Sequence, residues 1–348
     1  MSRSDISSAQ VYVVRAGRHG EREAAALKAN VATIGFDNIG DLSKYKSKET
    51  VKAHFAELYP DKSAVAIGNW AGQVWRFSHD IPVGATIILP SKMQSTIHVG
   101  RVTGPYYYSD DPKMLHCLPV EWKAEVPRTA FDKDLLYSFG TLLTVVSIKR
   151  EGGAERIWNA VDGKTTPVVN RPKSKESEEV SEAEESEVDL VQQAEDDIVR
   201  HMNRSLDGHD FADLVTELLE VQGYVSQPST PGADGGVDIL AGSGPLGFQE
   251  PRVCVQVKFT SATVDVRVLR ELQGVMRRTK AEHGLLVSWG GFKQSVLKEA
   301  RDDHFYIRLW SQQDVLEQIY RHYDKLSEEW RARVPLRRIW ALVSEGEG

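Results

Sequence analysis

The chain has 348 residues, of which 41% are hydrophobic and 27% are charged, and its formal net charge is −7. This length excludes a single small module and favours roughly two domains of about 150 residues, and the composition excludes a collagen-like or wholly disordered chain. The two cysteines, Cys117 and Cys254, lie far apart without a CxxC motif, which argues against a disulfide framework or a structural zinc site. The sequence shows no long apolar run and no apolar N-terminal stretch, so we expect a cytoplasmic protein without a membrane span or secretory signal.

The N-terminal half contains short apolar segments separated by turns. They lie at residues 11–14, 65–67, 86–89, 97–102 and 142–146. Many short strands favour a β-rich barrel or sheet, and one helix is predicted over residues 49–59. Residues 1–150 contain 19 Lys and Arg against 15 Asp and Glu, so this half is mildly basic.

Aromatic residues are prominent in this half. Trp70 and the run Tyr106, Tyr107 and Tyr108 follow glycines at predicted loops, where binding groups concentrate. Such rings can stack on extruded or single-stranded bases, although burial in the core is the alternative for each of them. Trp75 and Phe77 are spaced as in a strand that faces inward.

Short motifs in this half resemble the PUA-like/EVE superfamily of small β-barrels. They are VRAG at 14–17, IGF at 34–36, WRF at 75–77, VG at 83–84 and IHVGRVTG at 97–104. Such domains often read modified nucleobases, so the resemblance implies a PUA-like β-barrel over residues 1–165 that holds a base in an aromatic pocket. It also implies that Arg15 or Arg18 lies near the phosphates.

An acidic segment divides the chain. Residues 176–197 contain eleven Asp and Glu and no Lys or Arg, so the rest of the chain carries +4. Residues 171–187 are rich in Ser and Glu and cannot bury enough apolar surface to order themselves. We predict a flexible linker over 166–190, which acts as a solvated spacer rather than as a mimic of nucleic acid.

The C-terminal part, 191–340, alternates helices and strands. Phe211 to Leu219 has one apolar helical face. In the predicted strand 237–241, Val237, Ile239 and Ala241 share one face and Asp238 points to the other. Strict alternation over 253–259 predicts a second strand, with Gln256 and Lys258 side by side on its polar face. Further helices and strands, including a last helix to about residue 330, indicate a mixed α/β sheet flanked by helices.

Four motifs in this part resemble the Mrr-type restriction endonuclease domain of the PD-(D/E)XK superfamily, over about residues 207–316. They are the Phe-led helix 211–219 followed by Gly223-Tyr224, DGGVDI at 234–239, QVK at 256–258, and GLLV at 284–287 before a helix over 292–300. The resemblance implies a metal-dependent DNA endonuclease. Asp238, the Gln256 amide oxygen and the Val257 carbonyl would hold Mg²⁺ or Mn²⁺. Lys258 would orient or deprotonate the attacking water and offset developing charge.

Two features keep other interpretations open. Asp238 and Lys258 could form a buried ion pair, and Gln256 a hydrogen-bonded core amide. In addition, relatives commonly have Glu directly after the helix Phe, where this chain has Ala212. The nearby carboxylates Asp213, Glu217 and Glu220 are predicted to lie on a solvated helix face. Asp234, in a glycine-rich turn, is either a second carboxylate near the metal or a turn former.

The leading hypothesis is a DNA endonuclease that its N-terminal domain directs to altered bases, with a role in restriction of phage or foreign DNA. The partner would be double-stranded DNA, possibly with modified bases. Because cutting both strands needs two active sites or repositioning, we also expect a homodimer or larger homo-oligomer. The alternatives are a catalytically inactive nucleic-acid-binding protein with a nuclease fold, and an RNA-directed nuclease.

Overall fold

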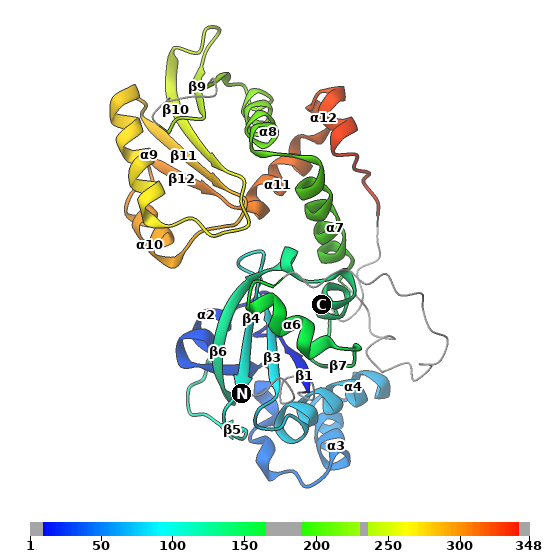
Figure 1. Cartoon of the computed structure of the whole chain (residues 1–348). Coiled ribbons are helices and arrows are strands. Elements are labelled where there is room, and N and C mark those ends of the chain that lie inside the picture. The colour runs from blue at the N-terminus through cyan, green and yellow to red at the C-terminus, as the bar shows by residue number, and fades with distance from the viewer. Residues whose placement is uncertain (1–9, 165–188, 230–235, 341–348) are drawn as a thin grey trace. The chain divides into compact units, whose positions relative to one another are not determined.

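The structure is a computed structural model that describes residues 10–164, 189–229 and 236–340 (Figure 1). The chain divides into two compact units, Met1–Asp196 and Asp197–Gly348. The predicted linker, 166–190, lies outside the described residues as far as position 188. None of the described helices is long and apolar enough to cross a membrane.

The N-terminal unit is built on a seven-stranded mixed sheet. Its strands are β1 (Val11–Val14), β2 (Val31–Ile34), β3 (Thr86–Pro90), β4 (Thr96–Val102), β5 (Tyr107–Tyr108), β6 (His116–Pro127) and β7 (Val145–Ile148). The strand order is β2-β6-β4-β3-β1-β7, with β5 paired to β6, and only β1 and β3 run parallel. Among these strands no ladder joins the two ends of the path, β2 and β7, so the predicted PUA-like barrel is not confirmed.

Helices surround this sheet. They are α2 (Glu23–Ala29), α3 (Lys48–Leu58), α4 (Ala64–Trp75), α5 (Lys133–Phe139) and α6 (Gly153–Val161), with a π-helix η3 (Arg76–Asp80) and the 3₁₀ turns η1 (Asp37–Ile39), η2 (Leu42–Lys44) and η4 (Arg128–Ala130). The helix predicted over residues 49–59 is confirmed as α3.

The predicted strand at 65–67 is wrong, because these residues lie in α4. The Ser63 hydroxyl caps this helix by accepting a hydrogen bond from the Ala66 N–H at 3.2 Å. Ile67, Ala71 and Val74 follow at helical spacing and are buried. The inward-facing strand predicted for Trp75 and Phe77 is also wrong, since Trp75 ends α4 and Phe77 lies buried in η3.

A buried carboxylate, Glu23, begins α2. It accepts hydrogen bonds from the Ser91 hydroxyl at 2.6 Å and from the Lys92 N–H at 3.0 Å. Burial alone would raise the pKa of Glu23, but His98 and these two hydrogen bonds hold it below its ordinary value of 4.5. A carboxylate whose pKa is depressed by folding stabilises the fold above its unfolded pKa, and that stabilisation is lost as the pH falls through the folded pKa.

We therefore expect Glu23→Gln to flatten the acid side of the stability profile of the N-terminal unit. The unfolding temperature of the wild type should fall more steeply between about pH 5 and about pH 3 than that of the variant. At neutral pH the free energy of unfolding of the variant should be about 2 kcal/mol lower. Differential scanning calorimetry of the full chain across this pH range measures both effects. Glu57→Gln, which changes a carboxylate that is 78% exposed, is the control. Equal pH profiles for wild type and Glu23→Gln would contradict the expectation.

The C-terminal unit holds a five-stranded mixed sheet. Its strands are β8 (Val225–Pro228), β9 (Ile239–Ser243), β10 (Gln249–Lys258), β11 (His283–Ser288) and β12 (Ile307–Trp310). The strand order is β12-β11-β10-β9-β8. β10, β11 and β12 run parallel, whereas β8, β9 and β10 run antiparallel. The predicted mixed sheet flanked by helices is thus confirmed.

Helices cover both faces of this sheet (Figure 1). They are α7 (Leu190–Ser205), α8 (Gly208–Glu220), α9 (Val266–Thr279), α10 (Gln294–Asp302), α11 (Gln312–His322) and α12 (Glu328–Arg333), with a 3₁₀ turn η5 (Tyr323–Lys325). The predicted last helix to residue 330 is interrupted, because α11 ends at His322 and α12 begins anew after Ser327, whose hydroxyl caps it.

Two apolar clusters divide the helices between the two faces. Val255 and Val257 of β10 pack with Phe211 and other residues of α7, α8, α11 and α12. Cys254 packs with residues of α9 and α10 on the opposite face. Val237 belongs to this second cluster and Ile239 to the first. The prediction that both share one face is therefore wrong, because β9 begins only at Ile239.

Candidate active site

Asp238 lies directly before β9 and opposite β10. The antiparallel register pairs Ile239 with Val255, so one further step sets Asp238 across from Gln256. The Asp238 N–H donates to the Val255 carbonyl at 3.0 Å, and the Val257 N–H donates to Asp238 Oδ2 at 2.6 Å. The carboxylate thus accepts a hydrogen bond from β10 just before β9 begins, which fixes its position beside Gln256.

Gln256 is 1% exposed, yet its amide oxygen Oε1 has no hydrogen-bond partner among the described residues. Its Nε2 lies close to Gly236, where an added Cβ would approach it to 3.5 Å. A buried acceptor without a partner costs free energy, so such a group calls for a ligand, an ion or a water. Among the described residues, Oε1 therefore does not behave as the oxygen of a hydrogen-bonded core amide.

Lys258 is the last residue of β10 and is half-buried. It alternates with Val257, so its side chain shares the α9 face of the sheet with Gln256 and Cys254. Its carbonyl accepts a hydrogen bond from the Trp289 N–H at 2.9 Å. In the described ranges its ammonium makes no ion pair with Asp238, which removes the buried ion pair as the reason for these two residues.

The oxygen atoms at this point are of the kinds that a hard cation prefers as ligands. The Asp238 carboxylate and the orphaned Gln256 oxygen lie on facing positions, and the Val257 carbonyl follows on the same strand. Mg²⁺ prefers oxygen ligands and keeps several waters, so few protein ligands suffice. The parts of the chain that the structure describes contain no group of three His, Cys, Asp or Glu side chains fit for a metal. Asp234, the predicted second carboxylate, lies outside the described residues.

Helix α8 adds no carboxylate to this group. Ala212 is partly buried against the apolar core, and Asp213 and Glu220 are exposed as predicted. Glu217 is partly exposed, and it accepts hydrogen bonds from the Ser327 N–H and, at 2.9 Å, from the Ser327 hydroxyl. It therefore fixes the start of α12, a role that the spacing along α8 did not reveal.

In the N-terminal unit the predicted aromatic residues have separate environments. Trp70 lies within α4 rather than in a loop, and its ring packs edge-on against Phe36, Phe55 and Tyr59, with centroids 5.3 to 6.4 Å apart. The loop position predicted for Trp70 is thus wrong. The indole is half-buried and belongs mainly to the core of the unit.

The three tyrosines differ in exposure. The Tyr106 hydroxyl accepts a hydrogen bond from the Leu42 N–H at 3.2 Å and lies 2.9 Å from His116 Nδ1, and burial raises its pKa well above the ordinary value. Tyr107 and Tyr108, which form β5, are 44% and 37% exposed. Of the run, only these two leave substantial surface for a stacked base.

The two predicted phosphate ligands also differ. The Arg15 guanidinium donates to the Phe139 carbonyl at 2.7 Å, and burial lowers its pKa to about 10, although Asp189 opposes this effect. Arg15 is thus held inside the N-terminal unit. Arg18 is exposed.

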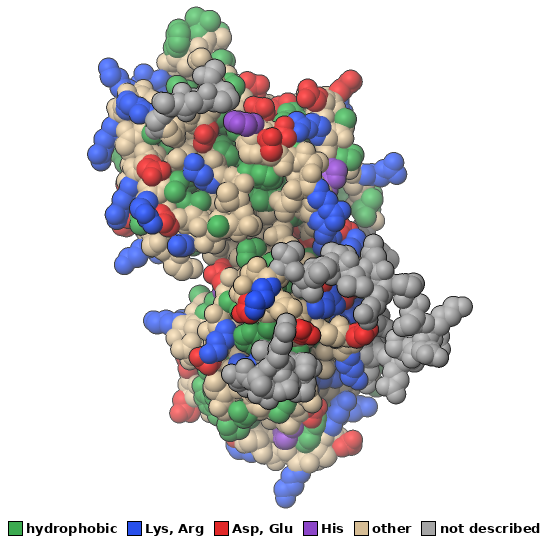
Figure 2. All heavy atoms as spheres, in the orientation of Figure 1, with side chains coloured by type: hydrophobic (Ala, Val, Ile, Leu, Met, Phe, Trp, Pro, Cys, Tyr) green, Lys and Arg blue, Asp and Glu red, His purple; other side chains and the backbone are tan. Residues whose placement is uncertain are grey.

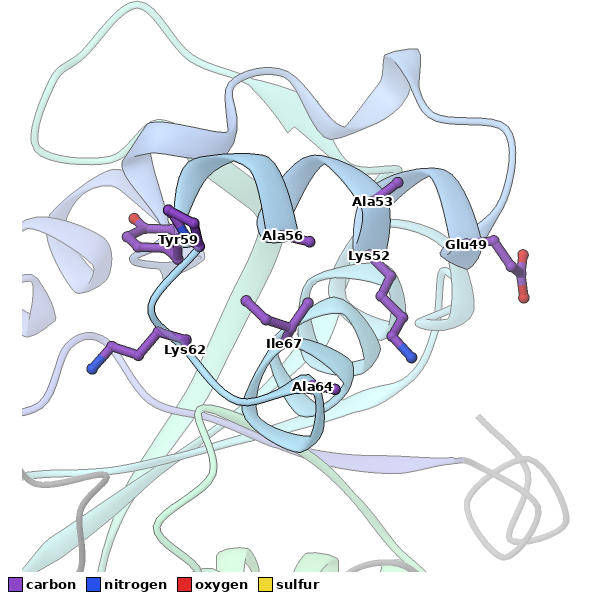
Figure 3. A pocket seen from close by; sticks show the side chains of 9 residues that line it. Glu49, Lys52, Ala53, Ala56, Tyr59, Lys62, Ala64 and Ile67 are labelled. Carbon is purple, nitrogen blue, oxygen red and sulfur yellow. The ribbon is translucent and has the colours of Figure 1, made fainter.

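A hollow of about 430 Å³ lies between α3 and α4 (Figure 3). Ile67 and three alanines form its apolar lining, and Tyr59 stands at one end. Lys52 and Lys62 lie at its rim. The side chains that line it do not include Trp70, the tyrosine run or the predicted arginines. This hollow was therefore not predicted from the sequence.

Two family models match separate segments of the chain. A family model described as restriction endonuclease, Mrr_cat, matches residues 203–319. A second model, a domain of unknown function named DUF8426, matches residues 12–148. A comparison with curated proteins found no match.

Three solved structures are similar to this chain. A protein of unknown function, AF1548, is 13% identical with a TM-score of 0.26, and the match covers 32% of this chain and 66% of that one, just under two thirds. The DNA modification-dependent restriction endonuclease AspBHI is 16% identical with a TM-score of 0.30, over 74% of this chain and 70% of AspBHI. The MspJI restriction endonuclease, in complex with a 27-mer oligonucleotide, is 14% identical with a TM-score of 0.32, over 79% and 70%.

The matched segment 203–319 contains Asp238, Gln256 and Lys258 on their two neighbouring strands. It also contains the mixed sheet and the helices α8, α9 and α10 on its two faces. Residues 203–319 are therefore a restriction endonuclease domain of the Mrr type.

Proposed function

We propose that the chain is a metal-dependent DNA endonuclease that cuts at Asp238, Gln256 and Lys258, and that its N-terminal unit directs it to DNA with altered bases in restriction of foreign DNA. The observation that carries the proposal is the buried, unpartnered Gln256 oxygen opposite the Asp238 carboxylate, inside a restriction endonuclease domain. By register the Asp238 carboxylate stands across from Gln256, whose Oε1 has no hydrogen-bond donor among the described residues, and oxygens of these two kinds are ligands that a hard cation prefers.

The residues of the chain have separate tasks in this proposal. Asp238 and Gln256, with the Val257 carbonyl, hold Mg²⁺ or Mn²⁺, which supplies a Lewis acid for the scissile phosphate when bound. The Asp238 position is fixed by the Val257 N–H. The Lys258 side chain forms no ion pair with a described carboxylate. As an ammonium it orients the attacking water and offsets negative charge in the transition state, whereas as a neutral amine it accepts the proton of that water.

Metal removal tests the reaction. We expect plasmid DNA carrying modified bases to be cut in the presence of Mg²⁺, cutting to stop when EDTA is added, and Mn²⁺ to restore it, because phosphodiester hydrolysis here depends on a bound cation. Plasmids that differ only in their base modification identify the recognised base, and an unmodified plasmid is the control. Cutting that continues unchanged in EDTA would contradict the metal-dependent mechanism.

A second candidate is a DNA-binding protein with an inactive nuclease fold, which the absence of a carboxylate at Ala212 favours. Calorimetric titration with Mn²⁺ separates the two functions. An active site should bind the ion in the wild type and lose that binding in Asp238→Ala, whereas an inactive site binds no ion that depends on Asp238.

The expected homodimer is tested by the mass in solution under cleavage conditions, and a monomer that cuts both strands would exclude it.

A further inference from the structure

The outer face of α9 carries four exposed arginines, Arg267, Arg270, Arg277 and Arg278, which we call the arginine stripe. At 3.6 residues per turn they fall within about 100° of the helix circumference, and they span about 16 Å along its axis. The only acidic residue within α9 is Glu271. The stripe is thus a strongly basic helix face in a chain whose net charge is −7.

The surroundings of the stripe carry both signs of charge, since Asp265 precedes α9 and α10 contains Glu299 and the exposed Asp302. Lys298 and Arg301 of α10 are exposed as well. Figure 2 shows Lys and Arg side chains gathered along the edge of the C-terminal unit where α9 and α10 lie. Within α9, Glu271 stands four residues after Arg267 at the border of the stripe, so four arginines share this helix surface with one carboxylate.

Several arginines of the stripe have partners within the chain, Arg278 among them. Arg267 lies 3.3 Å from Asp265, and Arg270 lies 2.9 Å from Glu299, with the arginine side chains 84% and 63% exposed. Exposed pairs of this kind are screened by water and salt, so a phosphate can take over the arginine. Arg277 makes no ion pair with any described residue.

The stripe lies on the same side of the sheet as the candidate active site. The inner residues of α9 pack with Cys254, whose face of β10 also carries Gln256 and Lys258. A Cβ at Gly236 would lie 3.5 Å from Gln256 Nε2 and 4.0 Å from Val275 of α9. The arginines therefore lie on the outer surface of the helix that covers the Gln256 face of β10.

We infer that the arginine stripe binds the sugar-phosphate backbone of duplex DNA beside the cleavage site. The inference rests on the proposed nuclease function, because it assumes that the bound DNA extends to the active site at Gln256. Guanidinium groups bind phosphate oxygens in a bidentate manner, and a stripe of about 16 Å spans several phosphates of one strand. Such contacts position the duplex without reading its sequence.

Salt dependence of DNA binding tests the stripe. Fluorescence anisotropy with a labelled duplex in EDTA measures binding without cleavage. We expect the double variant Arg267→Gln, Arg277→Gln to bind roughly ten- to thirtyfold more weakly at 0.15 M salt, and the slope of log K against log salt to fall by about 2. The loss should be the same for modified and unmodified duplexes. The double variant Arg267→Lys, Arg277→Lys keeps the charge and should retain the wild-type slope.

The matched control is Arg321→Gln, Lys325→Gln, two exposed cations on the opposite face of the sheet, and it should bind as the wild type does. If the Arg267→Gln, Arg277→Gln variant keeps the wild-type slope of log K against log salt, the inference about the stripe is overturned. The proposed nuclease function still stands in that case, provided that the wild type cuts DNA. The inference is also overturned if the double glutamine variant loses affinity for single-stranded RNA but not for the duplex. A wild type that binds duplex with the expected stripe dependence but never cuts it overturns the proposed function alone.

Discussion

Replacing Asp238 by asparagine is expected to slow DNA cleavage by about 10³-fold or more while leaving the fold intact. The substitution removes the only side-chain carboxylate in the proposed donor set, and with it most of the negative charge that holds a divalent cation. The asparagine amide oxygen can still accept the hydrogen bond from the Val257 N–H that the carboxylate now accepts at 2.6 Å. The backbone should therefore keep its course, and the loss should appear in the cleavage rate.

Cleavage time courses on modified plasmid DNA at saturating Mg²⁺ measure this effect, and thermal unfolding checks the fold. Asp213→Asn is the control, because it removes an exposed carboxylate from α8 in the same domain. It should cut at the wild-type rate. If Asp238→Asn also cuts at that rate, the active site lies elsewhere and the proposal for Asp238, Gln256 and Lys258 fails.

The polar face of β10 could be predicted from the sequence. Strict alternation over residues 253–259 is a period-two signal that does not depend on distant contacts. It placed Gln256 and Lys258 side by side on one face, opposite Val255 and Val257, as the two apolar clusters show. The unpartnered Gln256 oxygen could not be predicted, since it depends on the packing of residues far away along the chain.

The helix α4 shows the opposite outcome. The valine and isoleucine at 65–67 and the spacing of Trp75 and Phe77 suggested strands. The structure forms one helix of twelve residues, and its buried positions Ile67, Ala71 and Val74 lie at i, i+4 and i+7. This spacing and the preceding Ser63 were helix signals. Short apolar windows are ambiguous, and here the longer period decides the structure.

The exposure of the tyrosine run depends on tertiary contacts. Three adjacent tyrosines are equivalent in sequence, but Tyr106 turns inward to Leu42 and His116, whereas Tyr107 and Tyr108 remain on the surface. Leu42 lies in η2, 64 residues before Tyr106, and His116 is the first residue of β6. No local pattern of residues could separate the buried tyrosine from the exposed ones.

The second large effect is expected for Phe211→Ala, which should destabilise the C-terminal unit by about 3–5 kcal/mol. Phe211 is fully buried, and its ring stacks on Phe259 at 4.6 Å and meets Trp289 edge-on at 5.1 Å. Phe259 directly follows Lys258, and the Trp289 N–H donates to the Lys258 carbonyl. Truncation leaves a cavity under the end of β10, so it should loosen the Lys258 backbone as well as lower the stability.

Chemical denaturation of the full chain, followed by tryptophan fluorescence, measures the loss of stability, and cleavage at a temperature where the variant remains folded measures the effect on Lys258. Phe211→Leu, which keeps most of the buried volume, should cost less than about 1.5 kcal/mol. Phe305→Ala, at a ring that is 80% exposed, should change stability by less than about 0.5 kcal/mol. If Phe211→Ala were as stable as Phe305→Ala, the three rings would not form the support of β10, and the position of Lys258 would have to come from the sheet alone.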